Sequence, residues 1–138
     1  MAFIKSLVPL LLITGILACN NKADTNKTYS SYIEKGDSIA MKGDFAHALP
    51  LYTAAINLQP DSAADAYKLR ALCEYNLQKY VPAFNDVSAA IKIYPKDEQS
   101  FLLRARLNEM NDSLKSAIAD YTIALKLNPS DTQAINNR

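Results

Sequence analysis

The stretch ADAYKLRALCEYNLQKYVPAFNDVSAAIKIYPKD, residues 64–97, is one of three segments that align along their whole length. The others are YSSYIEKGDSIAMKGDFAHALPLYTAAINLQPDS, residues 29–62, and EQSFLLRARLNEMNDSLKSAIADYTIALKLNPSD, residues 98–131. Residue 63 is a single insertion between the first segment and the second. A fixed period of this size indicates repeated supersecondary units that stack on their neighbours.

Small and aromatic residues recur at the same places in all three segments. In the first, Ala48, Tyr52 and Ala55 lie at positions i, i+4 and i+7, which is one face of a helix. Each segment also carries a small residue where two helices must approach closely. The recurring sets are Ala48, Ala83 and Ala117; Ala55, Ala90 and Ala124; Gly36, Ala71 and Ala105; and Tyr32, Tyr67 and Phe101. We expect these residues to form the core.

A proline closes each segment, at Pro60, Pro95 and Pro129. The whole pattern resembles the tetratricopeptide repeat, a helix–turn–helix unit of 34 residues. This resemblance implies an all-α fold, an α-solenoid of about three units plus the start of a fourth helix pair. The repeat domain would span 29–138, as units 29–62, 64–97 and 98–131 and a partial unit 132–138.

Several positions depart from the family pattern. Lys35, Arg70 and Arg104 stand where leucine is common, and Val87 replaces the usual aromatic residue. Pro50 falls inside a predicted second helix, where it removes a backbone donor.

The last residues, DTQAINNR, match the opening of a fourth unit. About two helical turns are too few to cover the preceding helix well, so part of the Ile118–Ile123–Leu127 region should be exposed. Three interpretations stay open: the chain is a fragment of a longer protein, the short helix suffices as a cap, or the open face is a docking surface. The last would allow self-association through the uncapped helix face.

Residues 1–18 have the pattern of a secretory leader, with Lys5 followed by an apolar run from Ser6 to Ala18. This run is shorter than the roughly 20 residues that span a bilayer. Its end, Ile16-Leu17-Ala18-Cys19, resembles the lipobox of bacterial lipoproteins. The resemblance implies cleavage before Cys19 and lipid attachment to its thiol, which would anchor the protein to a membrane. The alternative is an ordinary leader that is cut after Ala18.

Residues 19–28 are polar and lack apolar periodicity, so we expect a flexible lipidated tether. Asn20 stands where aspartate would favour inner-membrane retention in well-studied Gram-negative lipoproteins. The resemblance therefore implies a lipid-anchored protein of the cell envelope, at the outer membrane rather than the inner one. With Cys19 acylated, Cys73 is expected to be a buried structural thiol.

Composition argues against several classes of function. The chain has 15 lysines and arginines against 14 acidic residues, and no basic patch that would bind nucleic acid. One histidine, His47, and two cysteines in no metal-binding spacing predict neither a metal site nor a cofactor. No nucleophile with a base can be assembled, so we expect no enzyme activity and place His47 on the surface.

The resemblance implies a concave face, lined by first helices, that binds a partner peptide or helix. By helical register, the predicted groove residues are Ile33, Asp37, Met41, Lys68, Leu72, Tyr75, Leu102, Arg106 and Glu109. Some family members hold a C-terminal carboxylate there with lysine and asparagine. The matching positions here are Asp37, Leu72 and Arg106, without asparagine, so we do not expect that clamp.

Charged residues also recur with the period. Arg70, Arg104 and Arg138 fall on first helices, and Asp86 and Asp120 fall on second helices. We expect ion pairs between the two sets, either within a unit or to the next unit. As exposed pairs they would contribute about 0–1 kcal/mol each and mainly set the stacking register.

These observations predict a membrane-anchored scaffold that mediates protein–protein interaction in the cell envelope. The alternative is the N-terminal repeat region of a longer periplasmic or cell-surface protein, whose effector or catalytic domain lies beyond Arg138.

Overall fold

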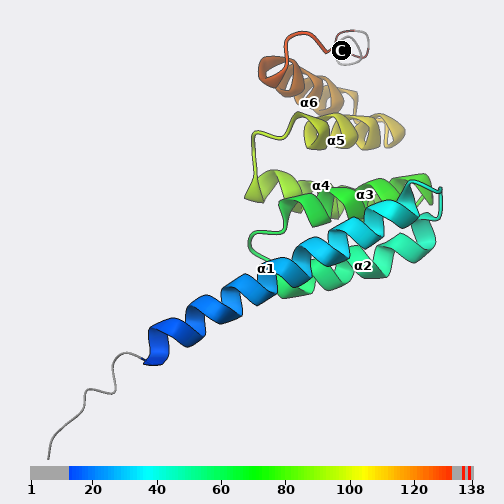
Figure 1. The fold of residues 1–138 in the computed structure, drawn as a ribbon. Coiled ribbons are helices and arrows are strands. Elements are labelled where there is room, and N and C mark those ends of the chain that lie inside the picture. Colours follow the sequence, from blue (N-terminus) through cyan, green and yellow to red (C-terminus); the bar gives the residue numbers. More distant parts are fainter. Residues whose placement is uncertain (1–12, 132–134, 136, 138) are drawn as a thin grey trace, which may run out of the picture.

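The computed structural model describes residues 13–131, Ile135 and Asn137, with side chains from Lys22 onward. Within this part, every element is helical: α1 (Ile13–Ala40), α2 (Phe45–Leu58), α3 (Ala64–Asn76), α4 (Tyr80–Ile93), α5 (Glu98–Met110) and α6 (Leu114–Leu127). Consecutive helices form three antiparallel hairpins, and α2 packs on α3 as α4 packs on α5 (Figure 1). The predicted all-α solenoid of helix–turn–helix units is confirmed.

The first helix is about twice as long as α3 or α5, and it corrects the expectation of a flexible tether. α1 begins at Ile13 and continues without a break through residues 19–28 into the first hairpin. This stretch contains no glycine or proline to end a helix, and Gln59 Nε2 donates to Asn26 Oδ1 at 2.6 Å. Residues 1–12 of the predicted leader lie outside the described residues. No described helix is both long and apolar enough to span a membrane.

The three hairpin turns have the same backbone geometry. Gly43, Gln78 and Asp112 occupy equivalent positions, and all three have positive φ, at 81°, 59° and 53°. Only the first turn uses glycine, the residue that adopts this conformation without steric cost. Asp44 then caps α2 by accepting from the His47 backbone N–H at 3.3 Å.

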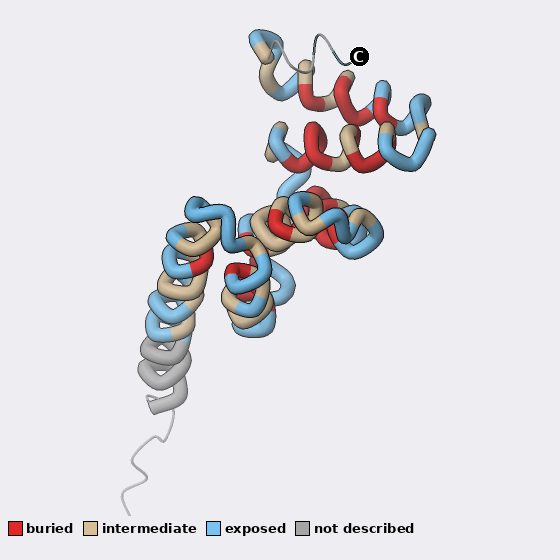
Figure 2. The backbone as a smooth tube through the Cα atoms, turned by 90° about the vertical axis from the view of Figure 1, so that its right-hand side faces the viewer, coloured by how far each residue is buried: buried red, intermediate tan, exposed pale blue. Residues whose placement is uncertain are grey.

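The core follows the recurring alanines, as predicted. Ala48, Ala55, Ala83, Ala90, Ala117 and Ala124 are all buried. Buried residues lie on the facing sides of the helices in each hairpin (Figure 2). Side chains this small let two helix backbones approach closely, so each hairpin is a thin layer that can stack on the next.

Gly36 marks the closest approach in the first hairpin. A Cβ added there would lie 2.6 Å from Tyr52 Cε1 and 2.9 Å from Tyr52 Cζ. The Tyr52 hydroxyl donates to Asp37 at 2.7 Å, which holds the ring over this glycine. In the third hairpin the Tyr121 hydroxyl donates instead to Glu109, four residues after Ala105. The two tyrosine hydroxyls thus have different partners, and it is the Tyr52 ring that leaves no room for a Cβ at Gly36.

We predict that Gly36→Ala lowers the free energy of unfolding by about 1–2 kcal/mol, because overpacking outweighs the better helix propensity of alanine. In a Tyr52→Val background the same change should be neutral or stabilising, because it reproduces the Ala71–Val87 pair of the second hairpin. Urea unfolding of the four proteins measures both effects. An equal effect of Gly36→Ala in the two backgrounds would contradict the ring contact as its cause.

Candidate peptide-binding groove

Buried ion pairs hold the first and second helices of two hairpins in register. Arg70 Nε and Nη2 donate to the two carboxylate oxygens of Asp86 at 2.5 and 2.8 Å. Arg104 makes the same fork with Asp120, at 2.9 and 2.6 Å. The pairing therefore runs within a unit, one of the two registers that the sequence left open. Arg138, the third predicted member, lies outside the described residues.

The burial of these pairs corrects the expectation that they are exposed. The Asp86 side chain is 11% exposed and that of Asp120 is 5% exposed. Bidentate geometry and low exposure make such a pair costly to break, because the remaining charge stays buried without its partner. Arg70 Nη1 also donates to Thr53 Oγ1 of α2 at 3.1 Å, so one guanidinium links the first hairpin to the second.

These fixed hairpins leave a groove between α3 and α5. The groove contains a cavity of about 400 Å³, which the end of α6 and the following turn close on one side. The residues lining it are Lys68, Leu72, Glu98, Gln99, Leu102, Leu103, Arg106, Asn128 and Asp131. Four predicted groove residues therefore come together here: Lys68, Leu72, Leu102 and Arg106.

The other predicted groove residues lie elsewhere or have partners inside the fold. Asp37 and Glu109 accept hydrogen bonds from the hydroxyls of Tyr52 and Tyr121. Tyr75 packs against the core, with its ring centroid 5.9 Å from that of Tyr80. Ile33 packs against buried residues of the first two hairpins, and Met41 is 88% exposed in the turn after α1.

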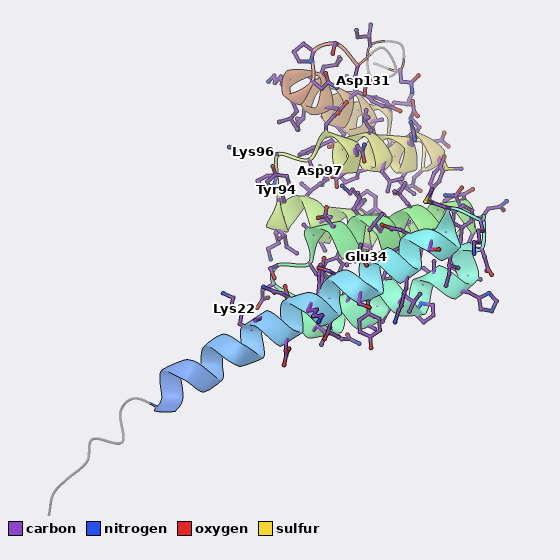
Figure 3. All side chains as sticks on the ribbon, viewed as in Figure 1. Lys22, Glu34, Tyr94, Lys96, Asp97 and Asp131 are labelled. Carbon is purple, nitrogen blue, oxygen red and sulfur yellow. The ribbon has the colours of Figure 1, made fainter. Side chains whose placement is uncertain are left out.

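Polar groups that the sequence analysis missed line one end of the cavity. Glu98 begins α5, and Asn128 and Asp131 follow α6 (Figure 3 labels Asp131). Asn128 Nδ2 donates to Glu98 Oε1 at 3.3 Å. A hydrogen bond with Asp131 is the largest cause that raises the pKa of Glu98. The resemblance to the tetratricopeptide repeat predicted groove residues on the first helix of each unit only. This end of the groove is formed partly by the turn after α6, which is the second helix of its unit.

No protein-family model matches the chain. Tetratricopeptide repeat protein 16 of Homo sapiens is 28% identical over 122 residues, which cover 83% of this chain and 14% of that protein. The Arabidopsis OM64 TPR domain is 27% identical, with a TM-score of 0.78, and the match covers 82% of this chain and 93% of that one. The chain has a tetratricopeptide repeat fold.

A second solved structure with this tetratricopeptide repeat fold contains a peptide. It is the second TPR domain of human RPAP3 in complex with the HSP70 peptide SGPTIEEVD, with a TM-score of 0.77 and 24% identity. The match covers 82% of the present chain and 93% of that domain.

The second repeat differs from the third beside its ion pair. Asn108 Nδ2 donates to Asp120 Oδ2 at 3.0 Å, and the equivalent residue of the second repeat is Glu74. Glu74 Oε2 is buried and has no hydrogen-bond partner. Burial, followed by repulsion from Asp86, raises the pKa of Glu74 to about 7, although Arg70 and Lys79 oppose the shift. A protonated Glu74 can donate to Asp86 as Asn108 donates to Asp120.

The open face of α6 is partly apolar. Leu114 is 62% exposed and Ile118 is 47% exposed, while Ile123 packs against the core. Leu127 is 38% exposed, so the prediction that part of the Ile118–Ile123–Leu127 region is exposed is confirmed. The Ile135 backbone N–H donates to the Asp131 carbonyl at 3.1 Å, the spacing of an α-helical hydrogen bond.

The remaining candidates for chemistry have structural explanations. Cys73 is buried, as predicted, and burial raises the pKa of its thiol to about 11, which keeps it unreactive. The exposed His47 contacts the Asp44 carboxylate at 2.8 Å. Among the described residues, no group of three or more histidine, cysteine or acidic side chains is placed to hold a metal ion.

We predict that Asp120→Ala lowers the free energy of unfolding by about 3 kcal/mol, because it leaves Arg104 without its buried carboxylate. Lys35→Ala is the matched control, since Lys35 occupies the position of Arg104 in the first repeat and Leu51 that of Asp120. The control should change stability by less than about 0.5 kcal/mol. Urea unfolding measures both, and a loss below 1 kcal/mol for Asp120→Ala would contradict the buried pair as a stabilising element.

We also predict that stability falls as pH rises from about 5 to 7, because folded Glu74 holds its proton up to a pKa of about 7 and the ordinary value is 4.5. Glu74→Gln should remove this fall and stabilise the protein at pH 8 by about 1 kcal/mol, an amount reduced by partial solvent screening. Thermal unfolding at pH 5 and pH 8 measures the difference. Glu34→Gln, on the exposed side of α1, is the control and should keep the wild-type pH dependence (Figure 3).

Proposed function

We propose that this protein is a non-catalytic scaffold that binds a partner peptide or helix in the groove between α3 and α5. The observation that carries the proposal is the cavity of about 400 Å³, in which four residues of the predicted concave face meet. It has apolar walls from Leu72 and Leu102 and charged groups at its rim, the composition that suits an extended peptide. The peptide in the RPAP3 complex supports a peptide ligand for this fold.

We further propose that the scaffold is lipid-anchored through Cys19 in the bacterial cell envelope, at the outer membrane. The support is the lipobox-like sequence Ile16-Leu17-Ala18-Cys19 after an apolar leader. Because α1 is helical from Cys19 to the first hairpin, this segment would act as a stiff spacer of about 15 Å. The groove lies between the second and third hairpins, so a lipid at Cys19 would leave it open to a partner (Figure 1).

A second candidate is the N-terminal repeat region of a longer protein that carries an effector domain. It is supported by the Ile135 N–H, which donates to the Asp131 carbonyl as the Tyr67 N–H donates to the Ala63 carbonyl at the start of α3. In that protein the exposed Leu114 and Ile118 would be covered by the next repeat. We also propose, as an alternative, that the protein self-associates through this face of α6.

The test combines acylation with site-specific crosslinking in the native cell. A photo-crosslinking amino acid at Gln99, in the groove, should capture a protein partner, and the same residue at Lys92, on the exposed side of α4, should not. Metabolic labelling with a fatty-acid analogue should modify the wild type and not the Cys19→Ser variant. Equal capture from both positions would contradict the groove, and unlabelled wild type would contradict the anchor.

A further inference from the structure

A second cavity lies between α4 and α5, near the opposite end of α5 from the groove. Its volume is about 470 Å³, and it is formed by the start of α4, the end of α5 and the turn that follows. Its apolar walls come from Tyr80, Val81, Phe84, Leu107 and Met110, and three asparagines and a serine complete the lining. The two cavities share no lining residue, so substitutions can test them separately.

The chemistry of this second cavity differs from that of the groove. None of the side chains that line it is acidic or basic, whereas both signs of charge line the groove. The polar side chains at its exposed rim include Asn85 and Asn111, and an amide both donates and accepts hydrogen bonds. An ionised ligand group would lose its hydration here without gaining an opposite charge, so the complementary ligand is uncharged and largely apolar.

The exposed apolar residues of this cavity are not explained by the stacking of the hairpins. Val81 is 75% exposed and Met110 is 51% exposed. At the junction of the first and second hairpins, the corresponding residues are Ala46 and Asn76, and Lys115 of α6 corresponds to Val81. The repeat therefore tolerates small or polar residues at both positions. Large apolar side chains that share one exposed cavity are typical of an interaction site, and methionine and aromatic residues are enriched at protein interfaces.

Other parts of the cavity are already held in place by the fold. Leu107 and Asn108 are buried, and Asn108 Nδ2 donates to Asp120 at 3.0 Å. The ring of Tyr80 packs against the core, with its centroid 5.9 Å from that of Tyr75. A ligand therefore meets a largely preformed surface and does not have to order these side chains on binding.

We propose that the cavity between α4 and α5 is a second binding site, which takes an uncharged apolar segment of a partner protein. Aliphatic or aromatic side chains of that segment pack on Val81, Phe84 and Met110, and its backbone exchanges hydrogen bonds with Asn85 and Asn111. This inference goes beyond the proposed function and does not depend on the groove between α3 and α5. With both sites occupied, the scaffold would hold two partners on different sides of α5.

The test begins with selection from a random dodecapeptide library on phage. The bait is the full chain in phospholipid nanodiscs, and empty nanodiscs remove peptides that bind lipid. Selected peptides are synthesised with acetylated and amidated ends and titrated by calorimetry. We expect a group of peptides with an uncharged apolar centre, whose binding the Val81→Lys/Met110→Asn double variant weakens at least tenfold. Both new residues occur at equivalent positions of the neighbouring units, so the variant should unfold at the same urea concentration as the wild type.

A matched control makes the same two substitutions in the first hairpin. Met41 and Ala46 are exposed and correspond to Met110 and Val81, so Met41→Asn/Ala46→Lys should leave affinity unchanged. The proposal is overturned if no selected peptide loses affinity in the double variant, or if those that do require a charged side chain. A photo-crosslinking amino acid at Asn85 that captures a second copy of the purified chain would overturn it in favour of self-association.

Discussion

Close approach of two helices within each hairpin is the constraint on which the rest of this structure depends. It requires a small residue on the first helix and alanines on the second, and the chain supplies both in every unit. Where the facing residue is Tyr52, even a Cβ does not fit at Gly36. Thin hairpins of this kind can stack through α2 on α3 and α4 on α5, and this stacking places α3 beside α5 to form a groove.

The three units share a backbone but differ in their polar interior. In the second and third units the ion pairs Arg70–Asp86 and Arg104–Asp120 join the two helices. The first unit has Lys35 and Leu51 at the matching positions, so it lacks both members of the ion pair. This agrees with the high cost of leaving one buried charge alone. The second and third units also differ next to the ion pair. The third has Asn108, whose side-chain amide donates to Asp120, whereas the second has Glu74, which can donate only when it is protonated. The interior of the second unit therefore contains a carboxyl group whose ionisation burial opposes.

Charged groups of both signs line the cavity between α3 and α5. Lys68 and Arg106 lie on its wall together with Glu98 and Asp131, and Lys68 Nζ is 3.2 Å from Asp97 Oδ1. A common backbone fixes where a peptide can lie, whereas the side chains at the rim decide which charge it carries. One end of the cavity is formed by the turn after α6, so the third hairpin supplies part of the cavity lining as well as stacking on its neighbour.

The sequence by itself determined the helical repeat and the alanines of its core, because a 34-residue period and alanines at helical spacing can be read directly from the order of the residues. It also assigned Lys68, Leu72, Leu102 and Arg106 to one face, and the structure places these four around one cavity. Only the tertiary structure decided that Arg70 pairs within its own unit, that Tyr75 packs inward, and that Glu98 and Asp131 line the same cavity. Each of these depends on distances between residues far apart in the chain, and periodicity assigns a residue to a face without saying which neighbour covers it. The helical course of residues 19–28 was missed for a related reason: a polar segment shows no apolar periodicity, whether it is a coil or a solvated helix.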